Sequence, residues 1–361
     1  MDLHQFLIPP SETTRRRGPQ DWIVSSSRVR LARNLAGLPF PGWAKKPERL
    51  RALETIRPVV AAQPQMADSF SDEMDNLTAL DKQILVERHL ISREHAAKTS
   101  GSGLVLNRDE TISVMINEED HLRMQALLPG LQIRQAWEMI DRFDTQLEER
   151  LPYAFHRRWG YLTACPTNLG TGIRVSAMLH LPGLVLAEQI AQIIQSVNKL
   201  GLAVRGLYGE GSDAFGNIFQ VSNQMTLGET ENKIVQRLEK VIAQIIEHEE
   251  NARASIFEKQ PKIVLNQIGR AYGTLANAHS ISSKEAMNLL SFLKLGIDLG
   301  LFPGVERALV DVLFLVTQPN HLQKLHTEKL GTDERDIIRA DMLRDHLSGV
   351  KRPLVKPPAQ S

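Results

Sequence analysis

The change of pattern at Gln260 and Pro261 constrains the fold of this chain more than any other feature. Before it, short runs of alternating apolar and polar residues are typical of β-strands, and amphipathic helical stretches separate them; the clearest runs are 21–34, 104–120 and 158–165. After it, the strand-like runs stop and the apolar spacing is helical throughout. The sequence therefore predicts an α+β fold in which a mixed part precedes a smaller all-α part.

The change from strand-like to helical spacing also predicts the boundaries of the two domains. In the second part, helices are expected at 304–316 and 333–347. The final residues, KRPLVKPPAQS, are expected to be disordered. We therefore expect a mixed domain at 1–258, a helical domain at 259–349 and a disordered tail at 350–361.

Composition narrows the class of protein. The 361 residues are 42% hydrophobic, which is enough to form the cores of two domains. The chain has 43 basic and 42 acidic residues, so its net charge does not indicate nucleic acid or an anionic membrane as a partner. Apolar stretches such as 308–316 are too short to span a bilayer, and the apolar stripe of 184–200 is expected to be helical core. With no evident signal peptide and a single cysteine, a cytoplasmic protein is expected.

The segment YLTACPTNLGTGIRVSAM, residues 161–178, is the most informative for function. The only cysteine, Cys165, ends an apolar run and begins a turn that contains Gly170 and Gly172. Glycines let a backbone approach an anion closely, and Arg174 delivers a guanidinium beside the turn. This combination is typical of a site that handles phosphate.

The Cys-Pro-Thr-Asn-Leu-Gly-Thr run at 165–171 resembles the hallmark segment of the ATP:guanido phosphotransferases, the phosphagen kinase family. The resemblance implies a catalytic domain built on an antiparallel sheet flanked by helices, with ATP as the phosphoryl donor. It also implies Mg²⁺ held mainly by the nucleotide and water, with no dedicated protein metal site. Other nucleotide motifs are missing: the sequence has no GxxxxGK[ST] loop, no GxGxxG after a strand, and no HRD loop to accompany DAFGN at 213–217.

Phosphoryl transfer relies on positioning and on positive charge, so arginines are the residues to look for. Arg28 and Arg30 lie two apart, so both point to one face of an extended strand. Alone, each arginine would be typical of a solvated surface charge, but Arg28, Arg30, Arg123, Arg174 and Arg205 match family segments whose arginines hold nucleotide phosphates. The ATP-binding residues that the resemblance implies are Ser26, Ser27, Arg28, Val29, Arg30, His89, Arg123, Arg174, Val175, Ser176, Ala177, Met178, Arg205, Gly206, Leu207, Tyr208, Gly209 and Glu210, although a structural role for His89 fits the sequence equally well.

A guanidinium acceptor is a poor nucleophile, so it must be fixed, have its charge countered and give up a proton. Carboxylates on two sides would do this, and Glu119 and Glu210 match the family's substrate glutamates. Glu119 is the expected catalytic base. Glu118 would point the opposite way if the segment is extended, Asp120 is a weaker candidate, and a solvated acidic turn is the alternative interpretation.

Cys165 is expected near the acceptor nitrogen, where Arg174 and a bound guanidinium would favour its thiolate. A small buried apolar residue is the alternative interpretation of a lone cysteine. We expect a supporting part in catalysis for Cys165 and Arg174, with direct phosphoryl transfer to the acceptor. The glycine-rich loop at 206–217, which contains Glu210, is expected to close over the substrate.

Two departures from the phosphagen kinases indicate a protein substrate. Those enzymes carry a helical domain of roughly 100 residues ahead of the arginine-pair strand, whereas Arg28 here lies near the start, so an open acceptor pocket is expected. The second departure is RDIIRA at 335–340, whose two arginines share a helix face beside Asp336. A charged solvent face is one interpretation. Bacterial protein arginine kinases are similar over almost the whole chain, and they imply an allosteric phosphoarginine site comprising Arg335, Asp336, Arg339 and Ala340.

The resemblance implies a protein arginine kinase that acts in the stress response and marks proteins for Clp-type proteolysis. The expected partners are arginine-presenting proteins, an activator protein, a heat-shock repressor and the Clp protease system, and the expected assembly is a homodimer or larger. Two alternatives stay open. One is a kinase for a small guanidino compound, and the other is a non-catalytic adaptor that binds ATP or phosphoarginine.

Overall fold

The computed structural model describes residues 17–206 and 215–356. It separates into two compact units along a discontinuous chain. The first unit comprises Met1–Ala177, Asn198–Ala203 and Val221–Ile242, and the second comprises Met178–Val197, Val204–Gln220 and Ala243–Ser361.

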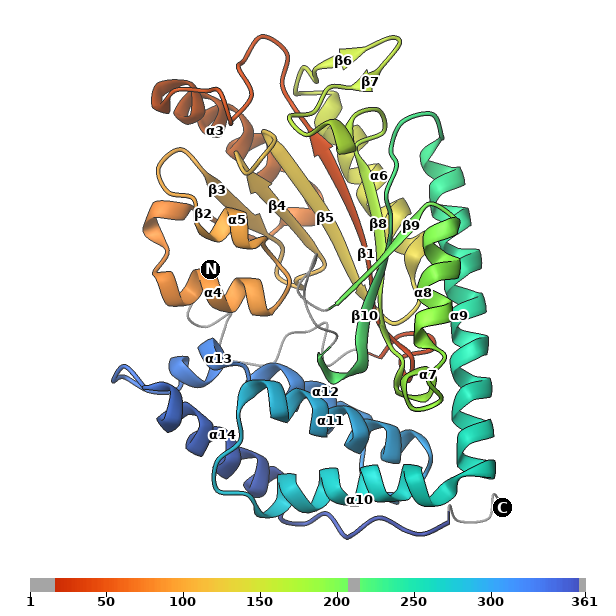
Figure 1. Ribbon diagram of the computed structural model, residues 1–361. Helices are drawn as coiled ribbons and strands as arrows, with labels where there is room; N and C mark the ends of the chain where they lie inside the picture. The colour runs from red at the N-terminus through yellow and green to blue at the C-terminus, as the bar shows by residue number, and fades with distance from the viewer. Residues whose placement is uncertain (1–16, 207–214, 357–361) are drawn as a thin grey trace. The chain divides into compact units, whose positions relative to one another are not determined.

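An eight-stranded sheet runs in the order β2-β3-β4-β5-β1-β8-β10-β9 (Figure 1). The pairings β1/β5, β2/β3, β3/β4 and β4/β5 are all antiparallel, which confirms the predicted kind of sheet. The strands are β1 Val24–Arg33, β2 Phe70–Glu73, β3 Gly103–Leu106, β4 Ile112–Ile116, β5 Leu122–Pro129, β8 Ile173–His180, β9 Leu202–Gly206 and β10 Ile218–Asn223.

Strand β1 shows how the sequence positions the site. Val29 and Leu31 are buried, while Arg28 and Arg30, which alternate with them, face the other way, as the two-residue period of a strand requires. The expected strand at 21–34 is therefore confirmed. The run at 104–120 is a hairpin of β3 and β4, and the run at 158–165 contains only β7, Gly160–Tyr161, which pairs with β6, Phe155–His156.

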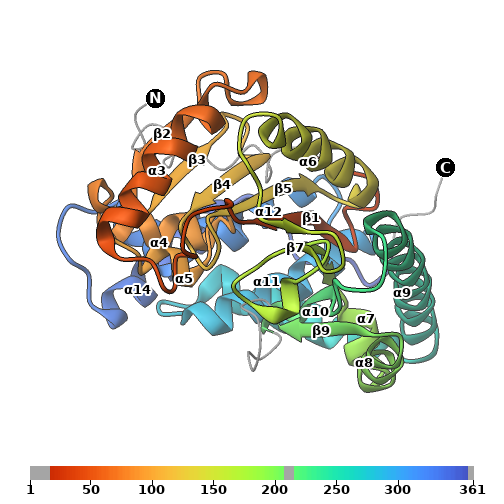
Figure 2. The same cartoon turned by 90° about the horizontal axis from the view of Figure 1, so that it is seen from above.

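Helices cover the sheet within the first unit. Helix α3, Lys46–Ala61, packs against β3 and β4, and α6, Ile133–Glu148, packs against β1 and β5 (Figure 2). The shorter helices α4, Ala79–Glu87, and α5, Arg93–Ala96, contribute to an apolar cluster with β2, β3 and β4. Long helix α9, Glu231–Lys259, follows the sheet in the chain.

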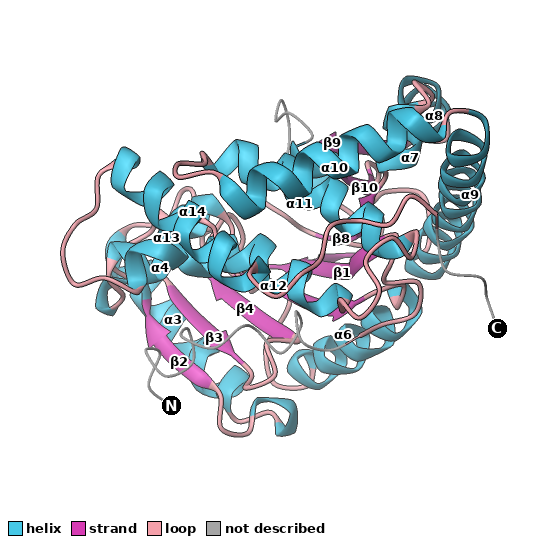
Figure 3. Ribbon diagram, turned by 90° about the horizontal axis from the view of Figure 1, so that it is seen from below, coloured by secondary structure: helices cyan, strands magenta, loops and turns pink. Residues whose placement is uncertain are grey.

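From Pro261 onwards the described chain is helical, as predicted (Figure 3). Pro261 occupies the first turn of α10, where its missing N–H is not needed, and Ser282 caps α11 by accepting a hydrogen bond from Glu285 N. The helices are α10 Pro261–Asn277, α11 Ser283–Asp298, α12 Arg307–Val316, α13 Pro319–Lys324 and α14 Thr332–Leu347, and their buried apolar side chains form one core. This confirms the α+β class with a helical C-terminal part.

Two expectations differ in detail. The helical stretch at 184–200 is two helices, α7 Pro182–Leu186 and α8 Ile190–Lys199, because Glu188 between them has a left-handed φ of 57°. Residues 351–356 lie in neither helix nor strand, and the rest of the expected tail is outside the described residues. No helix in the described ranges has both the length and the apolarity to cross a bilayer.

Candidate active site

Four of the five arginines converge in the first unit. Arg28 and Arg30 lie on β1, Arg123 on its partner β5 and Arg174 on its other neighbour β8. Burial, then repulsion by Arg123 and Arg174, lowers the pKa of Arg28 to about 10. Burial and the other three guanidinium groups lower the pKa of Arg30 well below its ordinary value. The four cations therefore share one electrostatic environment, which an anion would relieve.

This cluster fits a polyphosphate group. Arg30 Nε is buried, and within the described residues it has no hydrogen-bond partner, so a donor is available for a ligand oxygen. The described ranges contain no group of three or more His, Cys, Asp or Glu side chains that could hold a metal ion.

His89 lies beside the arginine cluster. It follows α4 with a left-handed φ of 60°, and its carbonyl accepts a hydrogen bond from Gln125 Nε2 at 2.8 Å. Burial, together with the nearby charge of Arg28, lowers the pKa of His89 to about 4. The imidazole is therefore neutral at physiological pH and adds no repulsion to the four arginines.

The remaining expected ATP-binding residues are placed unevenly. Ser27 is buried and its hydroxyl donates to Gly130 O at 2.8 Å, which is a structural contact. Val29, Val175, Ser176 and Ala177 are also buried, so none of them offers an exposed surface to a nucleotide in this structure. Ser26 is partly exposed on β1; Met178, Arg205 and Gly206 belong to the second unit; and Leu207, Tyr208, Gly209 and Glu210 lie outside the described residues.

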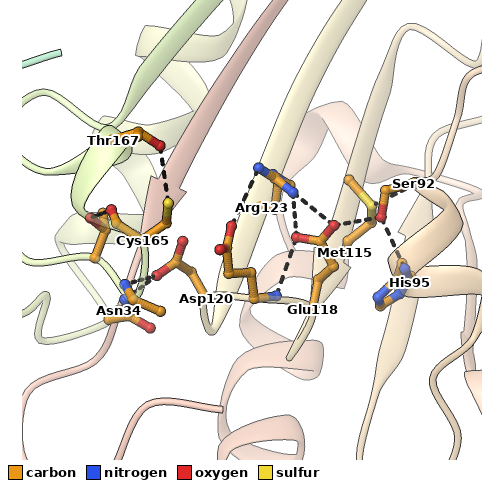
Figure 4. Close-up of polar contacts among 12 residues, drawn as sticks. Asn34, Ser92, His95, Met115, Glu118, Asp120, Arg123, Cys165 and Thr167 are labelled. Atoms are coloured by element: carbon orange, nitrogen blue, oxygen red, sulfur yellow. Dashed lines mark hydrogen bonds and ion pairs between the residues drawn. The ribbon is translucent and has the colours of Figure 1, made fainter. Parts of the chain in front are cut away.

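The turn between β4 and β5 carries the acidic residues. Glu118 is buried and accepts two hydrogen bonds from Arg123 Nη1, at 2.7 and 2.6 Å, and one from Ser92 Oγ at 2.5 Å (Figure 4). Burial alone would raise its pKa, but the Arg123 charge and these hydrogen bonds lower the pKa of Glu118 below its ordinary value. Glu118 is therefore an ionised partner of Arg123.

Glu119 has a different environment. Its side chain is 42% exposed, and its Oε2 lies 3.8 Å from Arg123 Nη2. Burial raises the pKa of Glu119, and the charges of Asp120 and Glu118 add to this, against the attraction of Arg123. Glu118 was expected to point the opposite way only in an extended segment. The segment is a turn, and both carboxylates reach Arg123.

Cys165 lies next to this turn. A side-chain hydrogen bond with the Cys165 thiol acts to lower the pKa of Glu119. Cys165 Sγ lies 3.0 Å from Thr167 Oγ1 (Figure 4). The residue is partly exposed among polar groups, unlike the buried apolar cysteine of the alternative interpretation. A thiol, a carboxylate and a guanidinium thus meet at one place.

The loop after Cys165 requires its glycines. Gly170 and Gly172 have left-handed φ values of 106° and 64°. A Cβ at Gly170 would lie 2.7 Å from Thr226 O, and one at Gly172 would lie 2.6 Å from Ala32 O. The loop is therefore packed closely against β1 and the segment after β10.

Arg33 holds this loop, a role that no sequence pattern indicated. Arg33 is buried and donates to Asp144 Oδ2 from Nε at 3.0 Å and from Nη2 at 2.6 Å. Its Nη1 donates to Thr171 O at 2.8 Å, and its guanidinium lies 3.6 Å from the ring centroid of Tyr161. Arg33 thus contacts both ends of the loop that contains Cys165.

The RDIIRA element lies on α14 in the second unit, and its two arginines differ. Arg339 is 1% exposed and donates to Thr317 O and Ile281 O, each at 2.8 Å, and to Asp336 Oδ1 at 2.5 Å. Arg335 is partly exposed, with one hydrogen bond to Leu330 O at 3.2 Å. Ala340 is fully buried in the helical core. In this structure the Arg339 guanidinium is engaged by the fold.

Known protein families match both the mixed part and the helical part of the chain. Residues 59–252 match the family described as ATP:guanido phosphotransferase, C-terminal catalytic domain, and residues 261–357 match the Protein-arginine kinase McsB C-terminal domain. A protein named protein-arginine kinase from Halothermothrix orenii is 45% identical over 92% of this chain and 95% of its own length. Another of that name from Brevibacillus brevis is 45% identical over 97% and 99%.

Solved structures are similar in fold. A lombricine kinase crystal structure matches with a TM-score of 0.58 and 25% identity, over 68% of this chain and 72% of its own. The duplicated taurocyamine kinase from Schistosoma mansoni with bound transition state analog components matches with a TM-score of 0.55 and 22% identity, over 66% and 34%. The second likeness concerns the fold alone.

Proposed function

The chain belongs to the ATP:guanido phosphotransferase family, and from that premise we propose that it is a protein arginine kinase, which transfers the γ-phosphoryl group of ATP to arginine side chains of proteins. One observation carries the proposal. Arg123 belongs to the cluster of four arginines and also contacts Glu118 and Glu119, so a cationic site for phosphate adjoins a carboxylate site for a guanidinium.

In the proposed reaction, Arg28, Arg30, Arg123 and Arg174 hold the phosphates of ATP and stabilise the charge of the transferring group. Mg²⁺, bound mainly by the nucleotide and water, would supply further charge neutralisation. Glu119 accepts the proton that the guanidinium nitrogen loses as its lone pair bonds to the γ-phosphorus and the bond to the ADP oxygen breaks. The raised pKa of Glu119 suits a group that must accept a proton.

Cys165 has a supporting part in this proposal. Its thiol lies against Glu119 and next to Thr167, where it can contact the acceptor guanidinium without forming a bond to phosphorus. Glu210, on the loop outside the described residues, would hold the acceptor from another side.

We assign catalysis to residues 1–258 and regulation and dimerisation to 259–349, followed by the tail 350–361. At the α14 element, partly exposed Arg335 would bind the phosphate of phosphoarginine and Asp336 its guanidinium. Arg339 would fix Asp336, and Ala340 would let α14 pack closely.

The wider role follows from family membership rather than from side-chain chemistry. We propose that the enzyme acts in the cytoplasm, where ATP is available, as part of the stress response. Its arginine phosphorylation would mark proteins for Clp-type proteolysis. An activator protein and a heat-shock repressor are the proposed regulatory partner and target.

The decisive experiment incubates the protein with Mg-ATP and a generic unfolded protein and maps phosphate by mass spectrometry under non-acidic conditions. Acid-labile phosphate is expected on arginine. Glu119→Gln is expected to lower its rate of formation by about 10²-fold or more, because a general base contributes that much. Glu149→Gln, an exposed carboxylate at the end of α6, is the matched control and should act like the parent.

Each alternative has its own outcome in this assay. Phosphate only on serine or tyrosine would refute arginine as the acceptor. Rapid phosphorylation of free arginine with none on protein would indicate a kinase for small guanidino compounds. Nucleotide binding without any turnover, even in a single-turnover experiment, would indicate an adaptor.

A further inference from the structure

Asn34 is a buried asparagine directly after β1 whose side chain joins three segments of the first unit. Its Nδ2 donates to Asp120 Oδ1 at 2.6 Å (Figure 4). Nδ2 also donates to Leu162 O at 3.1 Å, and Oδ1 accepts from His121 N at 2.9 Å. Only 1% of the residue is exposed. Both amide hydrogens and the carbonyl oxygen are therefore used inside the protein.

The segments that Asn34 joins carry the groups assigned to the acceptor. Asp120 and His121 belong to the turn that contains Glu119, and Leu162 lies three residues before Cys165. The same oxygen of Asp120 that accepts from Asn34 also accepts from Ala164 N at 2.6 Å. Asn34 and Asp120 together thus fix the backbone on either side of the contact between Glu119 and Cys165.

This bridge is not a second source of charge at the site. The Asn34 amide is neutral, and its three partners are the Asp120 carboxylate and two backbone groups. What it fixes is the separation of the two segments: among the described residues, the other hydrogen bond between the turn and the segment before Cys165 runs from Ala164 N to Asp120. A shift of about 1 Å in a reacting geometry costs on the order of 10²-fold in rate.

We propose that Asn34 is a positioning residue for the acceptor half of the active site, holding Glu119 against Cys165. This inference rests on the proposed function for its effect on turnover. The arginine cluster is held differently, because Arg28 and Arg30 are fixed by the β1/β5 ladder and Arg174 by β8. Loss of the bridge should therefore impair the acceptor step while nucleotide binding is unchanged.

The test compares the full-length parent with Asn34→Ala and Asn34→Asp. The aspartate keeps the shape and the acceptor for His121 N, but it loses both donors and places a second carboxylate against Asp120. Its defect should therefore be at least as large as that of the alanine variant. For each, kcat for arginine phosphorylation is expected to fall about 10- to 100-fold, with KM for ATP within about twofold of the parent value, a factor worth roughly 0.4 kcal/mol. Alkylation of Cys165 by iodoacetamide should become faster, because its segment is no longer fixed.

Asn107→Ala is the matched control. Asn107 is also buried and its amide also bridges chain segments, donating to Thr111 Oγ1 and accepting from Ile112 N, but at the opposite end of β4 from Glu118. It should lose stability while keeping the parental kcat and the parental alkylation rate. A merely structural Asn34 would give the same result as Asn107.

The remaining outcomes also decide the question. If Asn34→Ala does not fold, Asp120→Ala removes the contacts of Asp120 with Asn34 and with Ala164 N. Asn34 then stays bonded to His121 and Leu162, so a smaller loss of kcat and a smaller rise in the alkylation rate are expected. Parental kcat and parental alkylation in Asn34→Asp would overturn the proposal, and so would a loss of ATP affinity equal to the loss of kcat. If the parent itself forms no phosphoarginine, the proposed function fails, while the alkylation rates still decide whether Asn34 fixes Cys165.

Discussion

Three consecutive carboxylates between β4 and β5 have three different environments. Glu118 is ionised against Arg123 and Ser92, Glu119 is partly exposed with a raised pKa, and Asp120 is buried with its pKa raised by burial. Asn117 begins the turn with a left-handed φ of 57° and holds it through hydrogen bonds from Nδ2 to Arg49 O and Gly101 O. The position of each carboxylate within the turn, more than its residue type, therefore determines its burial and its pKa.

The first prediction at this scale concerns pH. Because the pKa of Glu119 is raised, kcat/KM should fall as pH decreases through a value above that of an ordinary glutamate. Asp120→Asn removes one of the charges that raise this pKa, so the acid limb of the profile should move to lower pH. The measurement is arginine phosphorylation by the two proteins across pH 4 to 8. An unmoved limb would mean that another group limits the reaction.

The second concerns stability. A carboxyl whose folded pKa is raised holds its proton more tightly when folded; its contribution to stability is present below the unfolded pKa and is lost as pH rises through the folded value. At neutral pH, ionised Glu119 therefore opposes folding. Glu119→Gln should have a melting temperature equal to or above that of the parent while activity is lost. A clear drop in melting temperature would instead make Glu119 a structural residue.

At the scale of elements, helix α14 shows that equal spacing does not give equal roles. Arg335 and Arg339 are one helical turn apart, yet Arg339 reaches into the fold to the ends of two other helices. Thr317 is the C-terminal cap of α12, and Ile281 precedes the cap of α11. Arg339 therefore joins three helices: it pairs with the carbonyl of the C-terminal cap of α12, which the helix itself leaves unpaired, and with the carbonyl of the residue before the cap of α11.

We accordingly predict that Arg339→Ala lowers the free energy of unfolding by about 3 to 5 kcal/mol, as expected when one partner of a buried charged pair is removed. Arg335→Ala, the matched control on the exposed side, should change it by about 0.5 kcal/mol or less. Urea denaturation monitored by circular dichroism measures both. Equal effects of the two substitutions would contradict the structural role of Arg339.

At the scale of the molecule, local patterns predicted the class and the succession of elements. The alternation around Arg28 and Arg30 gave β1 and its face, and the positions of Pro261 and Ser282 marked helix starts, because these signals act within a few residues. The break at Glu188 within 184–200 was missed, since its left-handed backbone is not a property of the local apolar spacing.

The missed site residues share a cause. Asn34 contacts a residue 86 positions away, and Arg33 contacts one 111 positions away. Spacing along one element cannot reveal such pairs; the local hint was a charged residue and a polar amide directly after the apolar residues Leu31 and Ala32. The likeness to a family supplied Glu119 and Cys165, but the inward-facing Glu118 required the turn itself.

The arginine cluster also gives a prediction for the whole molecule. Four mutually repelling cations lower stability until an anion binds, so Mg-ATP or inorganic tripolyphosphate should raise the melting temperature. At one hundred times the dissociation constant the gain is about 2.7 kcal/mol, and added salt should reduce it. Arg28→Gln should weaken the response. A ligand response unchanged in Arg28→Gln would place the anion elsewhere.

The compactness of the β4–β5 connection has a consequence for how this enzyme can change over time. Glu118, Glu119 and Asp120 are neighbours held between two paired strands. An insertion of one residue after Glu118 would therefore move Glu119 and Asp120 out of the positions in which they have their present contacts. Substitutions there can be tested by selection one at a time, whereas changes of length cannot. Changes in substrate choice are therefore expected in segments whose length can vary without moving Glu118, Glu119 and Asp120 out of their positions in the turn.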